Sequence, residues 1–577
     1  MIITKRLYTK EGKELGAVPL DAYPRPQLKR DNWQCLNGTW TLREKNGKER
    51  EILVPFCPES LLSGYKKKIN YGSRLIYKRA FKLNEELKNK RIILHFGAVS
   101  NICEVFINRK SICRHENAYI AFEADITEYL KEGENILEVI VINKLDNVLP
   151  SGKQKIKRGG MWYTPVTGIW QSVWLESVPD RYIKKIKIDV DLEGADILVS
   201  FNKSLNSKYV NDKAAKDKNI DGVIICEGKE YLVKNGKARI EPDNIRLWSP
   251  ENPALYDFTI ISGEDKVSSY FALRTILVKK VDNIPRLCLN GKPYFFNGLL
   301  DQGYFSDGIY TPASLSLFEK DIKIAKKLGF NTLRKHIKVE PEQFYYDCDR
   351  LGMVVFQDMV NNGGYSFLRD TFFPTIGISR KDDHNKHKNP DSRREFLKGM
   401  KYTVDQLYNH PCICYWTIFN EGWGQFCADE AYYKLKAYDK SRIIDSTSGW
   451  FMQKKSDVES LHVYFEKLHL GTRSNLPLVV SEFGGYVYKI RKHSFNLTET
   501  YGYRIFYRRK EYKKAVKRLY YKEVYPLIEK GLCAAIYTQL SDVEDETNGI
   551  LTYDRKKCRL RPEDIGSYEA YLQDRKA

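Results

Sequence analysis

The first 278 residues alternate hydrophobic and polar positions at the spacing of β-strands. In the run at 91–99, Ile92, Leu94 and Phe96 fall on one face. The run at 135–143 is apolar on both faces, which is typical of a central strand. Turn residues such as Gly and Asn separate these runs, and no long helical pattern interrupts them. The pattern predicts an all-β region of short strands.

This all-β region divides into two domains. Residues 1–180 carry many short strands, which predicts a jelly-roll β-sandwich. The alternation starts again at residue 181, with roughly seven short strands up to residue 278, and this number is typical of an immunoglobulin-like β-sandwich.

From residue 279 onward, apolar strands alternate with helical patterns. Leu315, Phe318, Ile322 and Ala325, for example, are spaced to share one helix face. Eight runs are strand candidates: 293–300, 331–336, 353–359, 412–420, 442–448, 460–465, 477–483 and 533–541. Eight strand–helix units over about 290 residues predict a (β/α)8 TIM barrel in residues 279–577. The stretch 360–395 is then a long loop after the third strand, at the rim of an active site.

Two glutamates stand at the carboxyl ends of predicted barrel strands, where TIM barrels carry their catalytic residues. Glu421 follows the fourth strand and Glu482 ends the seventh. Each follows a run that is too apolar to hold an unpaired charge, so we expect both where buried strands open into a cleft. Two carboxyl groups across a pocket can divide the roles of acid and nucleophile, because their surroundings can separate their pKa values.

Several longer motifs carry a resemblance to a known family. They are GGMWYTPVTGIWQSVWLE (159–176), LNGKPYFFNGLLDQGYFSDG at the barrel entry, WTIFNEGWG (416–424) and VVSEFGG (479–485). With these motifs the chain resembles glycoside hydrolase family 2, the family of β-galactosidases, β-glucuronidases and β-mannosidases, over essentially its whole length. The resemblance implies a retaining, exo-acting β-glycosidase that works by double displacement. It implies Glu421 as the general acid/base and Glu482 as the nucleophile.

The resemblance also suggests substrate-binding residues. The Asn420 amide is expected to bind the sugar 2-hydroxyl, Arg334 to hold the surroundings of the nucleophile, and Tyr464 to lie beside it. His336 stands one residue earlier than the histidine of the family, so a structural role and a sugar contact both stay open. Further candidates for contacts with the sugar are Asp301, Asp358, Trp423, Trp450, His462 and Gln539.

The identity of the sugar is less determined. Glucuronidases of the family carry an Asn-x-Lys element after strand 8, whereas this chain has Asn548-Gly549 without a matching lysine. The sequence therefore favours a neutral β-galactoside. A β-glucuronide or a β-galacturonide stays open, since basic residues of the 360–395 loop could replace the missing lysine. Another pentose or furanose glycoside of the same family also stays open. A carbohydrate-binding protein without catalysis is the alternative from another class.

The charge balance raises the question of an acidic partner. The chain has 95 Lys+Arg against 74 Asp+Glu, a formal net charge of +21. The densest basic run, 501–531, could bind nucleic acid, but it is also typical of an exposed barrel helix whose long basic side chains cover aromatic surface. Because no nucleic-acid fold signature accompanies the charge, we predict a glycoside partner and no nucleic-acid partner.

Location, cofactors and assembly follow from absent patterns and from the resemblance. No apolar run approaches the roughly 18 residues of a membrane span, and the N-terminal segment has no secretory signal pattern. The 12 cysteines lie in apolar runs without a CxxC pair, which favours reduced thiols and a cytoplasmic location. No cofactor or metal is predicted, because no ligand cluster or nucleotide motif has diagnostic spacing. The resemblance leaves a homo-oligomer possible.

Overall fold

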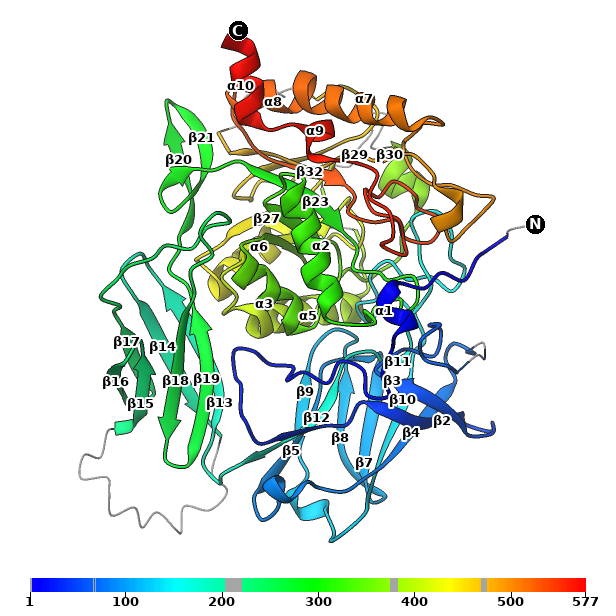
Figure 1. Cartoon of the computed structure of the whole chain (residues 1–577), viewed down its shortest axis with the longest axis vertical. Helices are drawn as coiled ribbons and strands as arrows, with labels where there is room; N and C mark the ends of the chain where they lie inside the picture. The colour runs from blue at the N-terminus through cyan, green and yellow to red at the C-terminus, as the bar shows by residue number, and fades with distance from the viewer. Residues whose placement is uncertain are drawn as a thin grey trace.

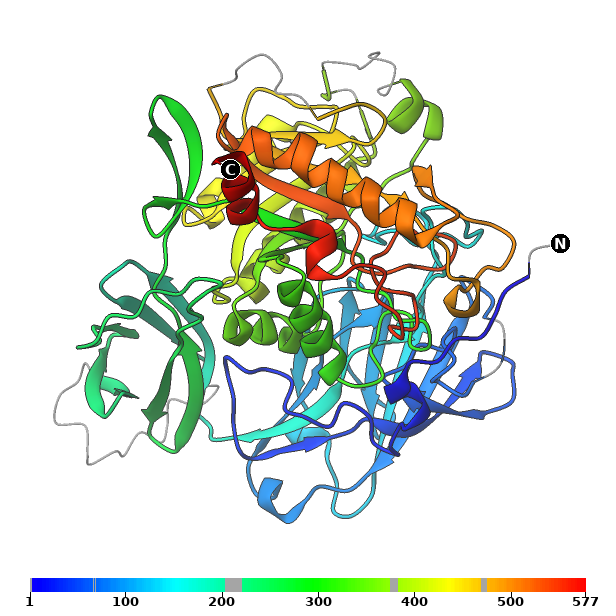
Figure 2. The same cartoon turned by 45° about the horizontal axis from the view of Figure 1, so that its top comes forward.

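The computed structural model describes residues 3–65, 67, 69–202, 220–373, 382–384, 386–468 and 475–576 of the 577-residue chain. The chain forms the three predicted domains in order (Figures 1 and 2). The two β-domains lie side by side, and the barrel with its helices lies above both of them in Figure 1. None of the helices in these described ranges is both long and apolar enough to cross a membrane.

The first domain is a sandwich of two antiparallel sheets, as predicted for a jelly roll. β10 lies between β4 and β7, in the central position that its sequence predicts, and it buries Leu137, Val139 and Val141 between the sheets. One sheet has the order β1 (Trp33–Cys35), β12 (Val173–Val178), β5 (Arg91–Phe96), β9 (Phe122–Asp125); the other has the order β3 (Arg50–Val54), β2 (Gly38–Glu44), β4 (Arg74–Phe81), β10 (Asn135–Ile142), β7 (Ile102–Ile107), β8 (Lys110–Glu116).

The second domain is a 7-stranded antiparallel sheet around its own apolar core. The strands at the two ends of the sheet, β13 and β19, contact each other, so the sheet folds over this core. The order is β13 (Ile183–Val190), β14 (Ala195–Phe201), β17 (Lys237–Ile240), β16 (Lys229–Lys234), β15 (Ile220–Cys226), β18 (Tyr256–Ser262), β19 (Asp265–Phe271). The predicted domain boundary at 278 falls inside β20 (Ile276–Val281), which pairs with β21 (Ile284–Leu289) in a separate small sheet.

The barrel is a sheet of 8 parallel strands. Its order is β27 (Ile443–Ser448), β26 (Ile413–Asn420), β25 (Val354–Asp358), β24 (Thr332–Lys335), β23 (Phe296–Asp301), β32 (Leu532–Thr538), β29 (Leu478–Gly484), β28 (Glu459–Val463). β27 and β28 contact each other where the barrel closes, and the Asp457 amide donates to the Ile444 carbonyl nearby at 2.9 Å. Each strand matches a predicted run, although β23 begins late because Lys292 and Pro293 pair with β21.

The helices between the strands follow the predicted pattern except at two connections. Between β28 and β29, none of the described residues, 464–468 and 475–477, is helical. Residues 449–458, between β27 and β28, form no helix. A full helical crossover needs a dozen or more residues. This connection is therefore too short to hold the helix that was predicted after β27. The helices that follow β23, β24, β25 and β26 are α2 (Ser316–Lys327), α3 (Glu342–Leu351), α5 (Pro390–Leu407) and α6 (Ala428–Tyr438).

The basic run at 501–531 forms the surface helix that its pattern predicts. α7 (Arg509–Leu519) lies between β29 and β32 in the chain and is drawn orange across the top of the barrel in Figure 2. It buries Tyr512, Val516 and Leu519, while its lysines and arginines lie toward solvent. These buried side chains form an amphipathic packing face on the helix.

Candidate active site

The guanidinium group of Arg334 lies at the centre of the site, where several barrel strands end. Its Nε donates to Oδ1 of Asp358 (3.0 Å) and its Nη1 to Oε1 of Glu482 (3.0 Å). Its Nη2 donates to Oδ1 of Asn420 (2.8 Å) and to Oγ of Ser448 (3.0 Å). These groups come from β24, β25, β26, β27 and β29. The fixed fork of an arginine suits this role, because it orients several acceptors at once.

Glu482 lies near the end of β29 and is 5 % exposed. Burial by itself would raise the pKa of this carboxyl, but the adjacent His462 and Arg334 outweigh it and lower the pKa to about 2. The second oxygen, Oε2, accepts a hydrogen bond from the Tyr464 hydroxyl. Glu482 is therefore ionised and held by donors on both oxygens.

Glu421 occupies the tight turn that follows β26. Its backbone has φ 52°, in the left-handed region that non-glycine residues rarely adopt, and its amide donates to the Ser448 carbonyl at 2.9 Å. Gly422 continues the turn with φ 69°. The turn places the side chain of Glu421 beside His462, whose Nδ1 lies 2.9 Å from Oε1 of the carboxyl group.

His462, on β28, bridges the two glutamates. Its Nδ1 contacts Glu421, and its Nε2 lies 3.6 Å from Oε1 of Glu482. One oxygen from each carboxyl group and a nitrogen of this histidine all lie within 4.8 Å of one another. Retaining glycosidases place their two carboxyl groups roughly 5–5.5 Å apart, whereas inverting ones leave room for a water molecule between them. The short separation fits the retaining geometry.

Asn420 has a fixed orientation and a free donor. Its Oδ1 accepts from Arg334 and also from Ser448 Oγ at 2.9 Å. This assigns the amide nitrogen to the other side, where no hydrogen bond to a described residue engages it. The Nδ2 group is available to a ligand over Glu482.

His336 and Tyr464 are two further polar side chains near Glu482. His336 Nδ1 lies 2.8 Å from Oδ2 of Asp358, and its buried Nε2 has no hydrogen-bond partner in the described residues. Burial lowers the pKa of His336, so the neutral ring presents a free nitrogen. The ring of Tyr464 stacks on that of Tyr503 with centroids 3.6 Å apart.

The remaining sequence candidates lie in different settings. Trp423 faces Trp162 edge-on, with ring centroids 5.0 Å apart, beside a recess of 270 Å³. The Trp450 ring lies 5.8 Å from that of His462. The Asp301 oxygens are occupied by Lys335 Nζ and the Gly303 amide, at 2.5 Å and 2.9 Å.

Gln539 follows β32 and is fully buried. Its Nε2 donates to Oδ1 of Asn548 at 2.8 Å, while its Oε1 has no partner in the described residues. This leaves the Gln539 carbonyl as a free acceptor.

Three further residues that the structure brings to the site were not predicted from the sequence. Ser448 ends β27 and binds both Arg334 and Asn420. Tyr503, on the connection after β29, supports Tyr464. Lys153 comes from the first domain, and its charge acts on Glu482. A polar residue at a strand end was a usable signal for Ser448, but no local pattern marks Tyr503 or Lys153.

Two groups in the described part of the chain bring possible metal ligands together. One is the trio Glu421, His462 and Glu482 of the candidate site, and the other is the partly exposed group His384, Cys427 and Glu430. The first trio is accounted for by the contacts described above. In the second, Cys427 and Glu430 follow the Glu421 turn closely in the sequence, and His384 Nδ1 lies 2.9 Å from Cys427 Sγ.

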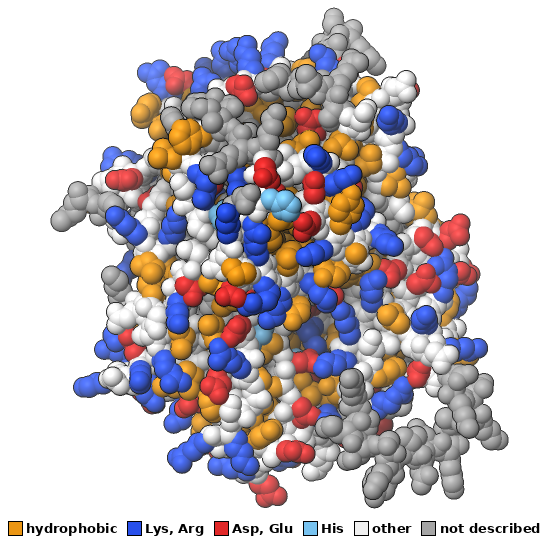
Figure 3. Space-filling model, turned by 180° about the vertical axis from the view of Figure 1, so that it is seen from behind, with side chains coloured by type: hydrophobic (Ala, Val, Ile, Leu, Met, Phe, Trp, Pro, Cys, Tyr) orange, Lys and Arg blue, Asp and Glu red, His pale blue; other side chains and the backbone are white. Residues whose placement is uncertain are grey.

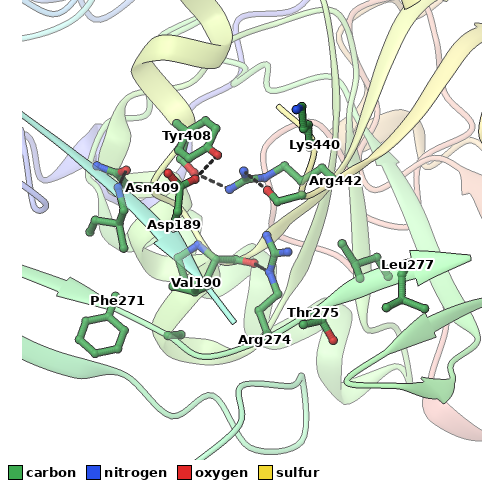
Figure 4. A pocket seen from close by; sticks show the side chains of 15 residues that line it. Asp189, Val190, Phe271, Arg274, Thr275, Leu277, Tyr408, Asn409, Lys440 and Arg442 are labelled. Atoms are coloured by element: carbon green, nitrogen blue, oxygen red, sulfur yellow. Dashed lines mark hydrogen bonds between the residues drawn. The ribbon is translucent and has the colours of Figure 1, made fainter. Parts of the chain in front are cut away.

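A separate cavity of 290 Å³ lies between the second domain and the amino-terminal end of the barrel strands (Figure 4). Arg274 enters it from the end of the second domain and donates to the carbonyls of Pro411 and Ile413, at 2.9 Å and 2.7 Å. Arg442 enters from the barrel and is paired with Asp439 at 2.9 Å. These contacts join the two domains, at the opposite end of the strands from Glu421 and Glu482.

Comparison with known families agrees with the domain order. The description "Glycosyl hydrolases family 2, sugar binding domain" matches residues 65–179, "Glycosyl hydrolases family 2" matches residues 178–274, and "Glycosyl hydrolases family 2, TIM barrel domain" matches residues 280–483. The three matches follow one another along most of the chain, in the order of the three structural domains.

Curated relatives include enzymes named for different sugars. A β-galactosidase of Thermoanaerobacter pseudethanolicus is 24% identical over 77% of this chain, and a putative β-glucuronidase of Formosa agariphila is 26% identical over 67% of it. The matched regions span 58% and 46% of those proteins, so the chain corresponds to about half the length of these relatives.

Solved structures share the fold over nearly the whole chain. A β-glucuronidase of Ruminococcus gnavus superposes with a TM-score of 0.74 at 17% identity, covering 97% of this chain and 100% of that one. A β-galacturonidase of Eisenbergiella tayi, bound to galacturonate, gives a TM-score of 0.67 at 19% identity, with 96% and 99% covered.

Proposed function

Since the chain belongs to glycosyl hydrolase family 2, we propose that it is a retaining, exo-acting β-glycosidase with Glu482 as nucleophile and Glu421 as general acid/base. The observation that carries the proposal is the pair of carboxyl groups whose oxygens lie within 4.8 Å of each other at the ends of β26 and β29. This separation suits direct attack on the sugar by one carboxylate.

In the first step, an oxygen of Glu482 forms a bond to the anomeric carbon while the bond to the leaving oxygen breaks. Glu421 gives its proton to that oxygen, so the aglycone departs as a neutral alcohol. In the second step, Glu421 takes a proton from a water molecule, the water oxygen bonds to the anomeric carbon, and the Glu482 carboxylate is released. Two displacements at one carbon retain its configuration.

The polar groups around Glu482 support this cycle. Arg334 and Tyr464 hold the nucleophile, and the low pKa of Glu482 keeps it ionised before attack. The free Nδ2 of Asn420 and the free Nε2 of His336 offer a donor and a neutral ring nitrogen for sugar hydroxyls. The recess beside Trp162, Tyr365 and Trp423 adjoins the acid/base turn and suits the leaving group.

Two classes of sugar are candidates. The sequence favours a neutral terminal β-galactoside. The ammonium group of Lys153, whose charge acts on Glu482, favours an acidic sugar instead. A panel of 4-nitrophenyl glycosides, comprising the β-galactoside, β-glucuronide, β-galacturonide, β-glucoside, β-mannoside, α-arabinopyranoside and galactofuranoside, distinguishes these classes.

The roles of the two glutamates predict different chemical behaviour of their variants. We expect Glu482→Gln to lower kcat/KM roughly 10,000-fold or more on every substrate, because no other group can form the glycosyl-enzyme. Glu421→Ala should lose less activity on a 2,4-dinitrophenyl glycoside, which needs no proton to leave. Added azide should then accelerate this variant and give a β-glycosyl azide, detected by NMR.

The matched control is Glu459→Gln, at the opposite end of the neighbouring strand β28, which should keep wild-type rates. Proton NMR of the first product formed should show the β-anomer. An α-anomer from the wild-type protein, or full activity of Glu482→Gln, would contradict the assignment. Wild-type protein that cleaves no member of the panel would favour the binding-protein alternative.

A further inference from the structure

A segment of the first domain reaches the catalytic end of the barrel. The amides of Ser151 and Gly152 donate to the Asn361 carbonyl, in the loop after β25, at 3.1 Å and 3.2 Å. Gly152 fits so closely that a Cβ there would lie 2.9 Å from the Ile337 carbonyl, in the loop after β24. The backbone of Lys153, the next residue, is therefore fixed between the first domain and the loops that surround the site.

The carbonyl of Lys153 accepts from the Tyr163 amide at 2.9 Å, which ties the segment to a second part of the first domain. The Tyr163 hydroxyl in turn donates to Oε2 of Glu546, in the loop after β32. Lys153 thus stands between the loops after β24 and β25 on one side and the loop after β32 on the other.

The ammonium group of Lys153 lies near enough to the groups around Glu482 to influence them electrostatically. It is half-buried, and its charge acts on Glu482, His336 and Glu546. Burial is the main reason that the pKa of His336 is lowered, and the Lys153 charge adds to the effect. No hydrogen bond or ion pair with another described residue holds the ammonium group of Lys153.

The nearby carboxyl groups already have partners. Glu482 is bound by Arg334 and Tyr464. Both oxygens of Glu546 accept hydrogen bonds, from Tyr163 and from Asn548, and burial raises the pKa of this carboxyl. The half-buried ammonium group of Lys153 therefore has no carboxylate among the described residues within hydrogen-bonding distance, and an anionic ligand group would form a charge-assisted hydrogen bond with it.

We propose that Lys153 binds a carboxylate on the sugar that lies over Glu482, so that the first domain selects a uronic acid as the glycon. This inference rests on the proposed glycosidase function and adds a specificity residue to it. A neutral sugar would leave the ammonium group unpaired, whereas the carboxylate of a uronic acid would supply the missing partner.

The test compares wild type, Lys153→Met, Lys153→Arg and the control Lys144→Met, an exposed lysine of the same domain. For each we would measure kcat and KM on the 4-nitrophenyl β-glucuronide, β-galacturonide and β-galactoside. We expect wild type to prefer one uronide. Lys153→Met should lower kcat/KM for that uronide roughly 10- to 100-fold, mainly through KM, and leave the galactoside within about threefold. Lys153→Arg should retain part of the uronide activity.

Two results would overturn the inference while leaving the glycosidase function intact. One is a wild-type protein that prefers the galactoside. The other is an equal loss on acidic and neutral substrates in Lys153→Met, which would mean that Lys153 serves only the charge of Glu482. Lys144→Met should match wild type on all three substrates.

A binding measurement separates this inference from catalysis. By titration calorimetry, wild type should bind D-glucuronate or D-galacturonate at least tenfold more tightly than D-galactose, and Lys153→Met should lose the difference. The binding measurement tests Lys153 even if no member of the glycoside panel is cleaved. Failure to cleave any of them would count against the proposed glycosidase function and not against the role of Lys153. Equal affinity of wild type for galactose and both uronates would contradict the role of Lys153.

Discussion

The guanidinium group of Arg334 shows how one residue sets the chemistry of its neighbours. Opposite charge within hydrogen-bonding distance stabilises the ionised form of Glu482 against the cost of burial. The same group fixes the Asn420 amide, so its role extends from charge to orientation. Arg334 is therefore a positioning residue for two other groups, whatever sugar the site accepts.

This role predicts a change in pH dependence. Glu482 must be ionised to attack, and its pKa of about 2 keeps the acidic limb of kcat/KM at low pH. Arg334→Met removes a cation, so the pKa of Glu482 should rise and the acidic limb should move to higher pH by at least about one unit. Arg334→Lys, which keeps the charge, is the control and should move the limb much less. A limb that stays in place in the methionine variant would refute the electrostatic role.

At the scale of the element, the turn after β26 decides where Glu421, the proposed acid/base, points. Glu421, Gly422 and Gly424 all have φ between 52° and 69°, so the chain coils back as soon as the strand ends. Such backbone costs free energy for a residue with a side chain, and it persists where the surrounding structure enforces it. Here the hydrogen bond from the Glu421 amide to Ser448 holds the turn against β27.

The turn should be sensitive to a single methyl group. A Cβ on Gly422 would lie 2.4 Å from the Phe451 ring, so Gly422→Ala must move the ring or the turn. Gly329→Ala is the matched control, because Gly329 also has positive φ, 90°, but has open space around a Cβ. Both variants should lose about 1 kcal/mol of stability from the backbone. Gly422→Ala alone should lower kcat, by at least about tenfold, because a small displacement of a catalytic group is costly; equal kcat in both would argue against this account.

At the scale of the whole molecule, the site belongs to two domains. The first domain contacts the loop after β32 through Thr164 and Glu544 and through Arg158 and Asp545. The net charge of +21 does not gather into one basic patch on the face seen in Figure 3, where lysine and arginine side chains are spread among acidic ones.

The domain contact predicts a stability that depends on pH. Burial raises the pKa of Glu544 from 4.5 to about 7. Between these values the folded protein keeps a proton that the unfolded chain has lost, so this contribution is full below pH 4.5 and disappears as pH rises through 7. The effect is at most about 3 kcal/mol.

Glu544→Gln should therefore reduce the fall in melting temperature between pH 5 and pH 8 by several degrees. The exposed Glu230→Gln should leave that fall as it is in wild type. The same fall in Glu544→Gln as in wild type would show that Glu544 does not titrate in this range. Scanning calorimetry at the two pH values gives the comparison directly.

Much of the fold was accessible from the sequence because it depends on local pattern. Alternation marked the strands of both sandwiches, and the apolar runs marked all 8 barrel strands. The prediction of a helix after every barrel strand was wrong for the connection between β27 and β28, which has too few residues for a full helical crossover. The described residues between β28 and β29, 464–468 and 475–477, are not helical either. Glu421 and Glu482 could be singled out because a charged side chain directly after a buried strand cannot stay unpaired in the core and is expected at a cleft.

The sequence by itself determined the order of domains, the barrel and the two carboxyl groups, since these follow from burial along short stretches of chain. Tertiary structure alone decided that His462 lies between Glu421 and Glu482, that Tyr503 stacks on Tyr464, and that Lys153 enters from another domain. These contacts join residues far apart in the chain. Their distances depend on how the barrel closes and how the first domain docks on it, and no local periodicity encodes either.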